Sequence, residues 1–407
     1  RAQRQIQEQV LDAAELANLA SKQEPIAIVG MSCQFPQSND VETYWNNILN
    51  KVDSITEIPK SHFDWQNYFD ANPLARDKII SKWGGFLSEV VFDPAPYGIP
   101  PSSLDSIDPM QVLILEAARS ALLDAGYNER KFPRDKTSVI LANAGHGPIT
   151  ALYSLRSMLG WKLDGLDEET TDQIKAVLPE WTEDSFAGYL GNVAAGRVAN
   201  RFDLKGINFS IDAACASSLA ALYVGVSDLR SHASDVVLLG ATDTHNQPGD
   251  YLSFSKTHAL SPSGRCKTFD AKADGIAISE GIAILVLKRL SDAERDGDRI
   301  YAVIKGIAGS SDGRDLSLTA PRPAGQMLAL HRAYSDAGVS PASVQIVEAH
   351  GTGTVAGDKA EVEALTNVFR SSGAELESCA IGSVKTNIGH SKAAAGLASV
   401  IKKIGRA

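Results

Sequence analysis

Short apolar runs alternate with longer amphipathic stretches along most of the chain. The apolar runs are rich in Val, Ile and Ala and end in polar or glycine-containing loops, which predicts strands at residues 26–33, 137–145, 207–215, 236–244, 282–290, 300–313, 344–354 and 379–390. The amphipathic stretches predict helices at residues 109–126, 215–232, 325–338 and 358–373. Because strands that are apolar on both faces must be covered on both sides, this pattern predicts an α/β fold with a buried, largely parallel sheet.

The first 24 residues have a different pattern. Apolar residues recur among charged residues and glutamines at helical spacing, at Ile6, Val10, Leu11, Leu16 and Leu19. This spacing predicts a separate amphipathic helix that cannot extend far beyond Pro25. Two interpretations stay open: a linker helix in solvent, or a short coiled coil or docking helix that pairs with another chain.

The composition is that of a soluble globular protein with one large domain or several smaller ones. The chain has 407 residues, of which 44% are hydrophobic and 22% are charged. Its formal net charge of −10 argues against nucleic acid as a partner, because phosphate binding needs clustered Lys and Arg. The amino terminus lacks the apolar core of a signal peptide and the apolar runs are too short to cross a bilayer, so we expect a cytoplasmic protein without membrane contact.

The four cysteines are far apart and form no CxxC pair. They predict neither a common zinc site nor a disulfide framework, and they fit a reducing compartment. The sequence contains no HExxH motif and no cluster of histidines with carboxylates, so we expect no bound metal. Cys33, Cys266 and Cys379 are expected to be packing residues, which leaves Cys215 as the candidate for chemistry.

Cys215 lies where a predicted strand ends and an amphipathic helix begins. The N–H groups and the dipole at a helix amino terminus favour negative charge, so we expect this position to lower the pKa of the thiol. The small neighbours from Ala213 to Ser218 leave room for a substrate. The position therefore predicts a nucleophile on a strand–helix turn, with a buried structural cysteine as the alternative.

Two histidines lie at similar junctions. His350 follows a strand and precedes the hydroxyl-lined loop GTGT, and His390 follows a strand and precedes a helix start made of small residues. The carboxyl ends of buried strands gather functional side chains at one edge of a sheet. We therefore expect Cys215, His350 and His390 to share one active site, although either histidine alone has the context of an ordinary core or surface residue.

Three segments carry a resemblance to a known family. DAACASS at 212–218, EAHGTGT at 348–354 and KTNIGH at 385–390 resemble the three active-site blocks of β-ketoacyl synthases. Further blocks agree, including EPIAIVGMSCQFP at 24–36 and LSPSGRCKTFDAKADGIAISEG at 260–281. From about residue 24 to its end, the chain resembles the ketosynthase domain of a type I polyketide synthase.

The resemblance implies a thiolase-like α/β fold, in which two similar halves form a layered helix–sheet core. We expect the half with the nucleophile at residues 25–255 and the half with both histidines at residues 256–407. The family continues after its GHSKAAAG-like segment with a long helix, further strands and a glycine-rich block. We therefore expect the carboxyl-terminal part of the second half to be missing from this chain, including an N–H that would complete an oxyanion hole with the N–H of Cys215.

The resemblance also implies a reaction, the decarboxylative Claisen condensation of polyketide and fatty acid biosynthesis. An acyl group is expected to pass from the phosphopantetheine arm of an acyl carrier protein to Cys215. A malonyl-type extender then loses carbon dioxide, and His350 and His390 are expected to stabilise the enolate by hydrogen bonds. The enolate attacks the acyl group on Cys215, and the product is a β-ketoacyl thioester on the carrier.

Supporting residues and partners follow from the same resemblance. Thr352 and Thr354 are expected to hydrogen-bond the pantetheine arm, and Lys385 is expected to order the His390 side of the site through an ion pair. No bound cofactor is expected. The expected partners are an acyl carrier protein, neighbouring polyketide synthase domains and a second copy in a homodimer. Three alternatives stay open: a non-condensing domain that only transfers acyl groups, an inactive scaffold, and a cysteine hydrolase, which usually needs a further orienting residue.

Overall fold

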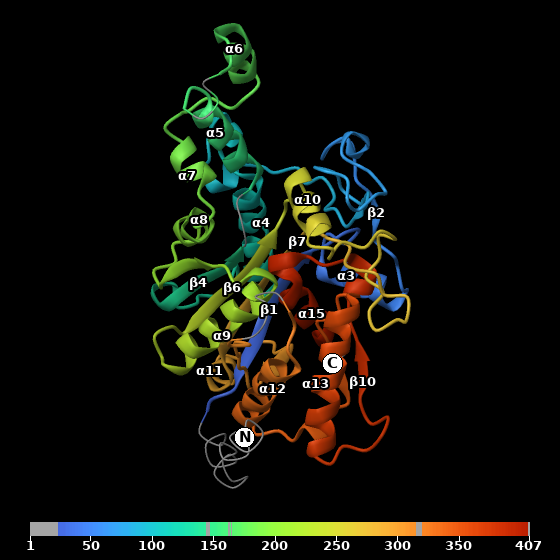
Figure 1. Cartoon of the computed structure of the whole chain (residues 1–407). Coiled ribbons are helices and arrows are strands. Elements are labelled where there is room, and N and C mark those ends of the chain that lie inside the picture. The colour runs from blue at the N-terminus through green and yellow to red at the C-terminus, as the bar shows by residue number, and fades with distance from the viewer. Residues whose placement is uncertain (1–22, 144–146, 162, 164, 315–319, 406–407) are drawn as a thin grey trace.

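A six-stranded sheet forms the centre of the molecule (Figure 1). The computed structural model describes residues 23–143, 147–161, 163, 165–314 and 320–405, so the predicted amino-terminal helix lies almost wholly outside the described residues. The strands follow the order β5 (Asn208–Ile211), β4 (Thr137–Asn143), β6 (Val236–Asp243), β7 (Gly281–Arg289), β1 (Ile26–Gln34) and β8 (Ala302–Ile304). All six were expected from the apolar runs, but β8 has only three residues.

The sheet is mixed, so the prediction of a largely parallel sheet is wrong. β4 pairs in parallel with β5 and β6, whereas β7 runs antiparallel to both β6 and β1, and β1 runs antiparallel to β8. An apolar strand indicates only that both faces of the sheet are covered, and an antiparallel strand between two helix layers is covered in the same way. The hydrophobic pattern therefore carries no information on strand direction.

Helices cover both faces of the central sheet. One face carries α4 (Pro109–Asp124) and α8 (Val193–Arg201), and the other carries α3 (Val41–Leu49), α9 (Ser217–Arg230) and α15 (Ala395–Ile404). Alternate residues of β1, β4, β6 and β7 belong to the two opposite cores: in β4, Val139 and Leu141 pack with the first group, and Ile140 and Ala142 pack with the second. This arrangement explains why the strand is apolar at successive positions.

A second, smaller sheet carries the segments that lead to the two histidines. β9 (Ile346–Glu348) and β10 (Ala380–Gly382) pair in parallel, and the connection between them contains α13 (Val355–Ser371). α12 (Pro323–Ala337) packs against α13, and α14 (Lys385–Ile388) follows β10, whereas α11 (Leu290–Arg295) packs against β1 and β7 of the central sheet. Lys402 of α15 forms a 2.6 Å ion pair with Glu348 of β9, which ties this sheet to the central one. β7 and β8 follow residue 256 but belong to the central sheet, and the division between residues 255 and 256 stays a prediction.

Two further regions extend from this core. α5 (Pro148–Met158), α6 (Glu168–Ala176) and α7 (Ser185–Tyr189) project away from the central sheet (Figure 1). On another side, β2 (Thr56–Glu57), β3 (Trp83–Gly84) and α10 (Pro248–Lys256) surround a third core, in which Tyr251 is fully buried. Within the described residues, no helix is long and apolar enough to cross a membrane.

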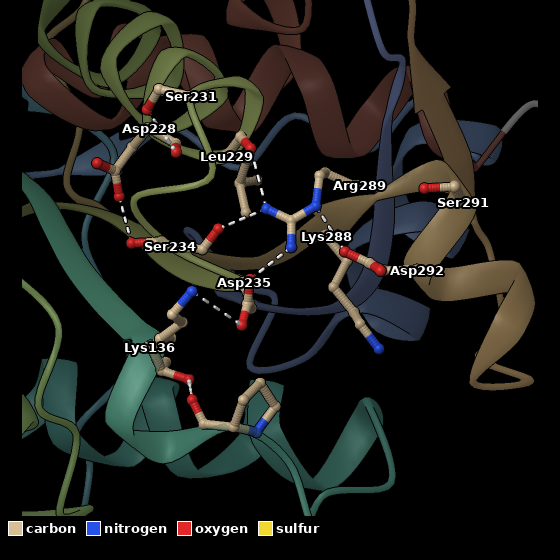
Figure 2. A network of polar contacts seen from close by, with 12 residues as sticks. Lys136, Asp228, Leu229, Ser231, Ser234, Asp235, Lys288, Arg289, Ser291 and Asp292 are labelled. Carbon is tan, nitrogen blue, oxygen red and sulfur yellow. Dashed lines mark hydrogen bonds and ion pairs between the residues drawn. The ribbon is translucent and has the colours of Figure 1, made fainter.

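A polar network closes the sheet at the end of β7 (Figure 2). The register pairs Asp243 with Gly281, so Arg289 lies at the opposite end of β7 from the junctions predicted to carry function. The Arg289 side chain is only 6% exposed, and its guanidinium donates to or pairs with four neighbours: Leu229, Ser234, Asp235 and Asp292. Because most donors of this buried cation have acceptors, the network fixes the loop between α9 and β6 to the end of β7.

Candidate active site

Cys215 lies on a tight turn between β5 and α9, as the sequence predicts. The turn is the short helix η5 (Ala214–Ala216), and Ala214 adopts a left-handed conformation with φ of 50°. Asp212 Oδ1 accepts from the Ala214 N–H at 2.9 Å, and Ser217 Oγ accepts from the Ala213 N–H at 2.8 Å and donates to the Ala214 carbonyl at 2.7 Å. Side chains on both sides of the cysteine therefore hold the strained backbone that presents it.

The pKa of the Cys215 thiol is raised, so the prediction of a lowered pKa is wrong for the free chain. Burial is the largest cause, the ammonium groups of Lys385 and then Lys392 act in the opposite direction, and the carboxylate of Asp243 raises the pKa further. The free energy lost when a thiolate is removed from water is larger here than the stabilisation that the helix end and the two cations provide. The thiol therefore needs a proton acceptor, or a change of environment on substrate binding, to react as thiolate.

The structure brings the two predicted histidines together. The ring centroids of His350 and His390 lie 5.3 Å apart, with the ring planes nearly perpendicular at 85°. His390 is 1% exposed, whereas His350 is exposed to solvent. One buried and one accessible imidazole therefore lie next to each other.

His390 has a defined hydrogen-bonding state. Its Nδ1 accepts from the backbone N–H of Lys392 at 3.0 Å, so the neutral ring carries its proton on Nε2. Burial lowers the pKa of His390 well below its usual range, and Lys385, His350 and Lys392 add to the effect. The ring is therefore a neutral donor through Nε2–H at physiological pH.

A carboxylate that sequence reasoning missed holds the backbone of His350. Glu361 of α13 accepts from the His350 N–H at 2.7 Å through Oε1 and from the Gly351 N–H at 2.8 Å through Oε2. Burial, followed by the charge of Lys385, lowers the pKa of His350 to about 4. Solvent reaches His350 and weakens both effects. The only signal in the sequence is an acidic residue eleven positions after the histidine on the next helix.

The GTGT loop brings the two predicted threonines together. Thr352 Oγ1 lies 3.0 Å from Thr354 Oγ1, and the glycines before each threonine have φ of 44° and 79°. A Cβ on the second of them, Gly353, would lie 2.7 Å from the backbone nitrogen of Lys267, so only glycine fits this close approach. Asp358 accepts from the Gly353 N–H at 3.1 Å, which makes it a second carboxylate that the sequence reasoning missed.

Lys385 is buried at 2% exposure, but the expected ion pair is not seen among the described residues. The nearby carboxylates have other partners, because Glu348 pairs with Lys402 at 2.6 Å and Glu361 accepts two backbone N–H groups. Burial lowers the pKa of Lys385, and the thiol of Cys266 followed by these two carboxylates raises it. The role of Lys385 in ordering the His390 side of the site stays a prediction.

The turn with Cys215 packs next to the segment that follows His390. η5 contacts η7 (Lys392–Ala394), and the backbone N–H of Gly396 donates to Ser218 Oγ at 3.0 Å. All four cysteines are free thiols. The described part of the chain has no group of His, Cys, Asp or Glu side chains arranged to hold a metal ion. The catalytic roles of the cysteine and the two histidines remain predictions.

Two family models together match almost all of the chain. The model of the beta-ketoacyl synthase N-terminal domain matches residues 23–293, and that of the beta-ketoacyl synthase C-terminal domain matches residues 301–405. Among curated proteins, the chain is 40% identical to a polyunsaturated fatty acid synthase of Thraustochytrium sp. and 39% identical to polyketide synthase PksN of Bacillus subtilis. These matches cover 96% and 94% of the chain but only 14% and 7% of the relatives.

Solved structures agree with the family models. The ketosynthase from module 6 of the bacillaene synthase of Bacillus subtilis superposes with a TM-score of 0.78 at 36% identity, covering 94% of this chain and 60% of the other. An oxazolomycin ketosynthase domain from Streptomyces albus gives 0.81 at 31% identity, covering 94% and 62%. The predicted thiolase-like fold class is thereby confirmed, and the chain spans less than two thirds of the structures that share it.

Proposed function

The chain belongs to the β-ketoacyl synthase family, and from that premise we propose that it catalyses decarboxylative Claisen condensation of carrier-bound acyl groups. The pair of perpendicular imidazoles at 5.3 Å carries the proposal, because a hydrolase or a pure acyl transferase has no need for two neutral donors on one space. The relatives are parts of polyketide and polyunsaturated fatty acid synthases, which supports the same class of substrate.

Acyl transfer is the first step. The sulfur of Cys215 attacks the carbonyl carbon of an acyl-pantetheine thioester, and the pantetheine thiolate leaves with a proton. His350 is neutral and open to solvent, so it is suited to accept the proton of the thiol and to return it to the leaving group. The backbone N–H of Cys215, in η5 just before α9, donates to the developing oxyanion.

Decarboxylation and condensation form the second step. The bond between the malonyl carboxylate and its α-carbon breaks, carbon dioxide leaves, and the electron pair forms an enolate on the thioester. His390 donates to the enolate oxygen from Nε2–H, and His350 provides the second donor. The enolate carbon then attacks the acyl carbonyl on Cys215, and the carbon–sulfur bond breaks to free the thiolate, which takes up a proton from solvent.

Supporting roles are part of the same proposal. Thr352 and Thr354 place two hydroxyl groups 3.0 Å apart beside His350, suited to the amide groups of a pantetheine arm. Lys385 adds a positive charge that favours the enolate and the thiolate. No bound cofactor or metal is needed, since the substrates bring the reactive thioesters.

The partners we propose are an acyl carrier protein, neighbouring synthase domains and a second copy of the chain. The relatives that the chain matches are far longer than the chain itself, which supports work within a multidomain synthase. A cytoplasmic, reducing compartment belongs to the proposal as well, because Cys215 must remain a free thiol.

Intact-mass measurement after incubation with an acyl-pantetheine thioester tests the nucleophile. The parent protein should gain one acyl mass, and the Cys215→Ala variant should gain none. Cys379→Ala is the matched control, because Cys379 is also a partly exposed free thiol and its loss should change nothing. Equal acylation of the parent and Cys215→Ala would refute the assignment.

Carbon dioxide release from a malonyl carrier tests the histidines and separates condensation from simple acyl transfer. The His390→Ala variant should still be acylated at Cys215 but should release carbon dioxide at least about 100-fold more slowly, as is usual for loss of an oxyanion donor. A parent protein that is acylated but releases no carbon dioxide would favour the non-condensing alternative.

A further inference from the structure

We propose that Lys392 is a positioning residue for His390. Its backbone N–H fixes the His390 ring, and a buried side-chain anchor formed with Asp243 and Asn246 holds that backbone in the required conformation. This inference deepens the proposed function, because it assigns the element that sets the orientation of one of the two enolate donors. Lys392 touches neither substrate nor reacting atoms in this role.

The backbone of Lys392 is in an unfavourable conformation. Its φ is 44°, in the left-handed region that a residue with a Cβ avoids. In this conformation its N–H points at Nδ1 of His390, two residues earlier, at 3.0 Å. Ala393 and Ala394, which follow Lys392, are fully buried, so a return to right-handed φ would have to be taken up by the preceding peptide, which carries this N–H. That displacement would take the N–H away from Nδ1 of the buried ring, so the conformation is a requirement for the tautomer.

The side chain of Lys392 supplies the restraint. Its ammonium donates to Asn246 Oδ1 at 2.7 Å and to the Ser279 carbonyl at 3.3 Å. It also lies 2.9 Å from Asp243 Oδ1, an ion-pair distance at an angle outside that of a hydrogen bond. Lys392 is 8% exposed and Asp243 is fully buried, so solvent does not compete for these contacts.

The anchor is itself attached to elements that frame His390. The Ser279 N–H donates to the His390 carbonyl at 2.9 Å, and Asn246 Nδ2 donates to the Gly85 carbonyl at 3.1 Å. Asp243 is the last residue of β6, in the middle of the central sheet. The lysine therefore connects the ring to three separate parts of the rigid core, which a flexible surface lysine does not do.

The pair also flanks the nucleophile, which gives a second consequence. Lys392 lowers the pKa of Cys215 and Asp243 raises it, so the two members of the pair act on the thiol in opposite directions. If one member of the pair is removed, the pKa of the thiol should shift in the direction set by the charge of the member that remains. Asp243→Asn should increase the fraction of thiolate, and Lys392→Met should decrease it; the other charge acting on the thiol, Lys385, is unchanged in both variants.

The direct test compares two double variants that differ by one methyl group, Lys392→Gly/Asp243→Asn and Lys392→Ala/Asp243→Asn. Both remove the ion pair, but glycine adopts positive φ without cost and alanine does not. The glycine variant should release carbon dioxide from a malonyl carrier at least about fivefold faster than the alanine variant, the factor that corresponds to about 1 kcal/mol. Acylation of Cys215 should be similar in the two.

Lys51 provides the matched control. It is an exposed lysine outside the site, with φ of 56°. Lys51→Gly and Lys51→Ala should differ in stability but not in carbon dioxide release. Equal release by the glycine and alanine variants at position 392, or an equal glycine advantage at position 51, would overturn the positioning role.

Nitrogen NMR of the histidine rings distinguishes failure of this inference from failure of the proposed function. The parent should show His390 as the neutral tautomer with Nδ1 unprotonated, and Lys392→Ala/Asp243→Asn should show a mixture of tautomers. This readout does not depend on catalysis. An unchanged tautomer in the alanine variant would refute the positioning role even if the parent condenses, and a parent that does not decarboxylate would refute only the proposed function.

Discussion

Replacing Glu361 by Gln tests whether one carboxylate sets the position of His350. The two carboxylate oxygens accept the backbone N–H groups of His350 at 2.7 Å and Gly351 at 2.8 Å. The amide of Gln has one oxygen, so its NH₂ group faces one of the two N–H donors and that hydrogen bond is lost. The side-chain volume hardly changes, which confines the perturbation to this contact.

The magnitude follows from the kind of hydrogen bond that is lost. A hydrogen bond to a charged group contributes about 1.5–3 kcal/mol. If this free energy is lost from the placement of His350 in the transition state, the step that needs His350 slows roughly 10- to 150-fold. Asp358 still holds the next part of the loop through Gly353, so the rest of the GTGT turn should stay in place.

The assay measures carbon dioxide release from a malonyl carrier beside acylation of Cys215 by intact mass. Glu361→Gln should slow decarboxylation by the factor above, and it should slow acylation too, because the proposal uses His350 in both steps. Glu363→Gln is the matched control, because Glu363 is exposed on the same helix two residues later. A folded Glu361→Gln protein that releases carbon dioxide at the parental rate, or an equal loss in the Glu363 variant, would refute the reasoning.

Three further predictions follow from described contacts. Burial lowers the pKa of His350 to about 4, so the stability that comes from keeping this imidazole neutral is present above the unfolded pKa of about 6.5 and is lost as pH falls toward 4. The urea midpoint of His350→Gln should therefore fall less on acidification than that of the parent. An equal fall in both proteins would contradict a lowered pKa for His350. Thr352→Val or Thr354→Val should raise KM for a carrier-bound substrate about fivefold with less change in kcat, and an unchanged KM would exclude contact with the pantetheine arm. Arg289→Met should lower the free energy of unfolding by about 3 kcal/mol in denaturant titrations, because it leaves the buried partners of Arg289 unpaired. Replacing the exposed Arg295 by Met should change the free energy of unfolding by less than about 1 kcal/mol. Similar effects of the two variants would show that the Arg289 network does not contribute to stability.

Much of the fold could be predicted from the sequence because burial leaves a local pattern. The strands β1, β4, β6 and β7 lie within a few residues of their apolar runs. The run expected at 300–313 gives only the three residues of β8, because its second part contains glycines and polar residues that leave the sheet. The direction of each strand could not be predicted from the hydrophobic pattern, because it depends on pairing with distant segments of the chain.

The candidate site was predictable to a similar degree. Cys215 and His350 lie within four residues of the ends of β5 and β9, which is a local signal. His390 was expected at the end of a strand as well, but β10 ends at Gly382 and α14 separates it from the histidine. The expected ion pair of Lys385 was wrong because Lys402, from a helix near the end of the chain, already pairs with Glu348. Such competition between long-range partners leaves no mark near the residue in question.

The place of β1 in the central sheet has a consequence for biosynthesis. β1 lies between β7 and β8, and both of these neighbours follow it by about 250 residues. At a translation rate of about 5–20 residues per second, a nascent chain carries this apolar strand without its partners for roughly 12–50 s. Ribosome-associated chaperones are therefore expected to bind the emerging segment around β1, and its release should wait until β7 and β8 have left the exit tunnel.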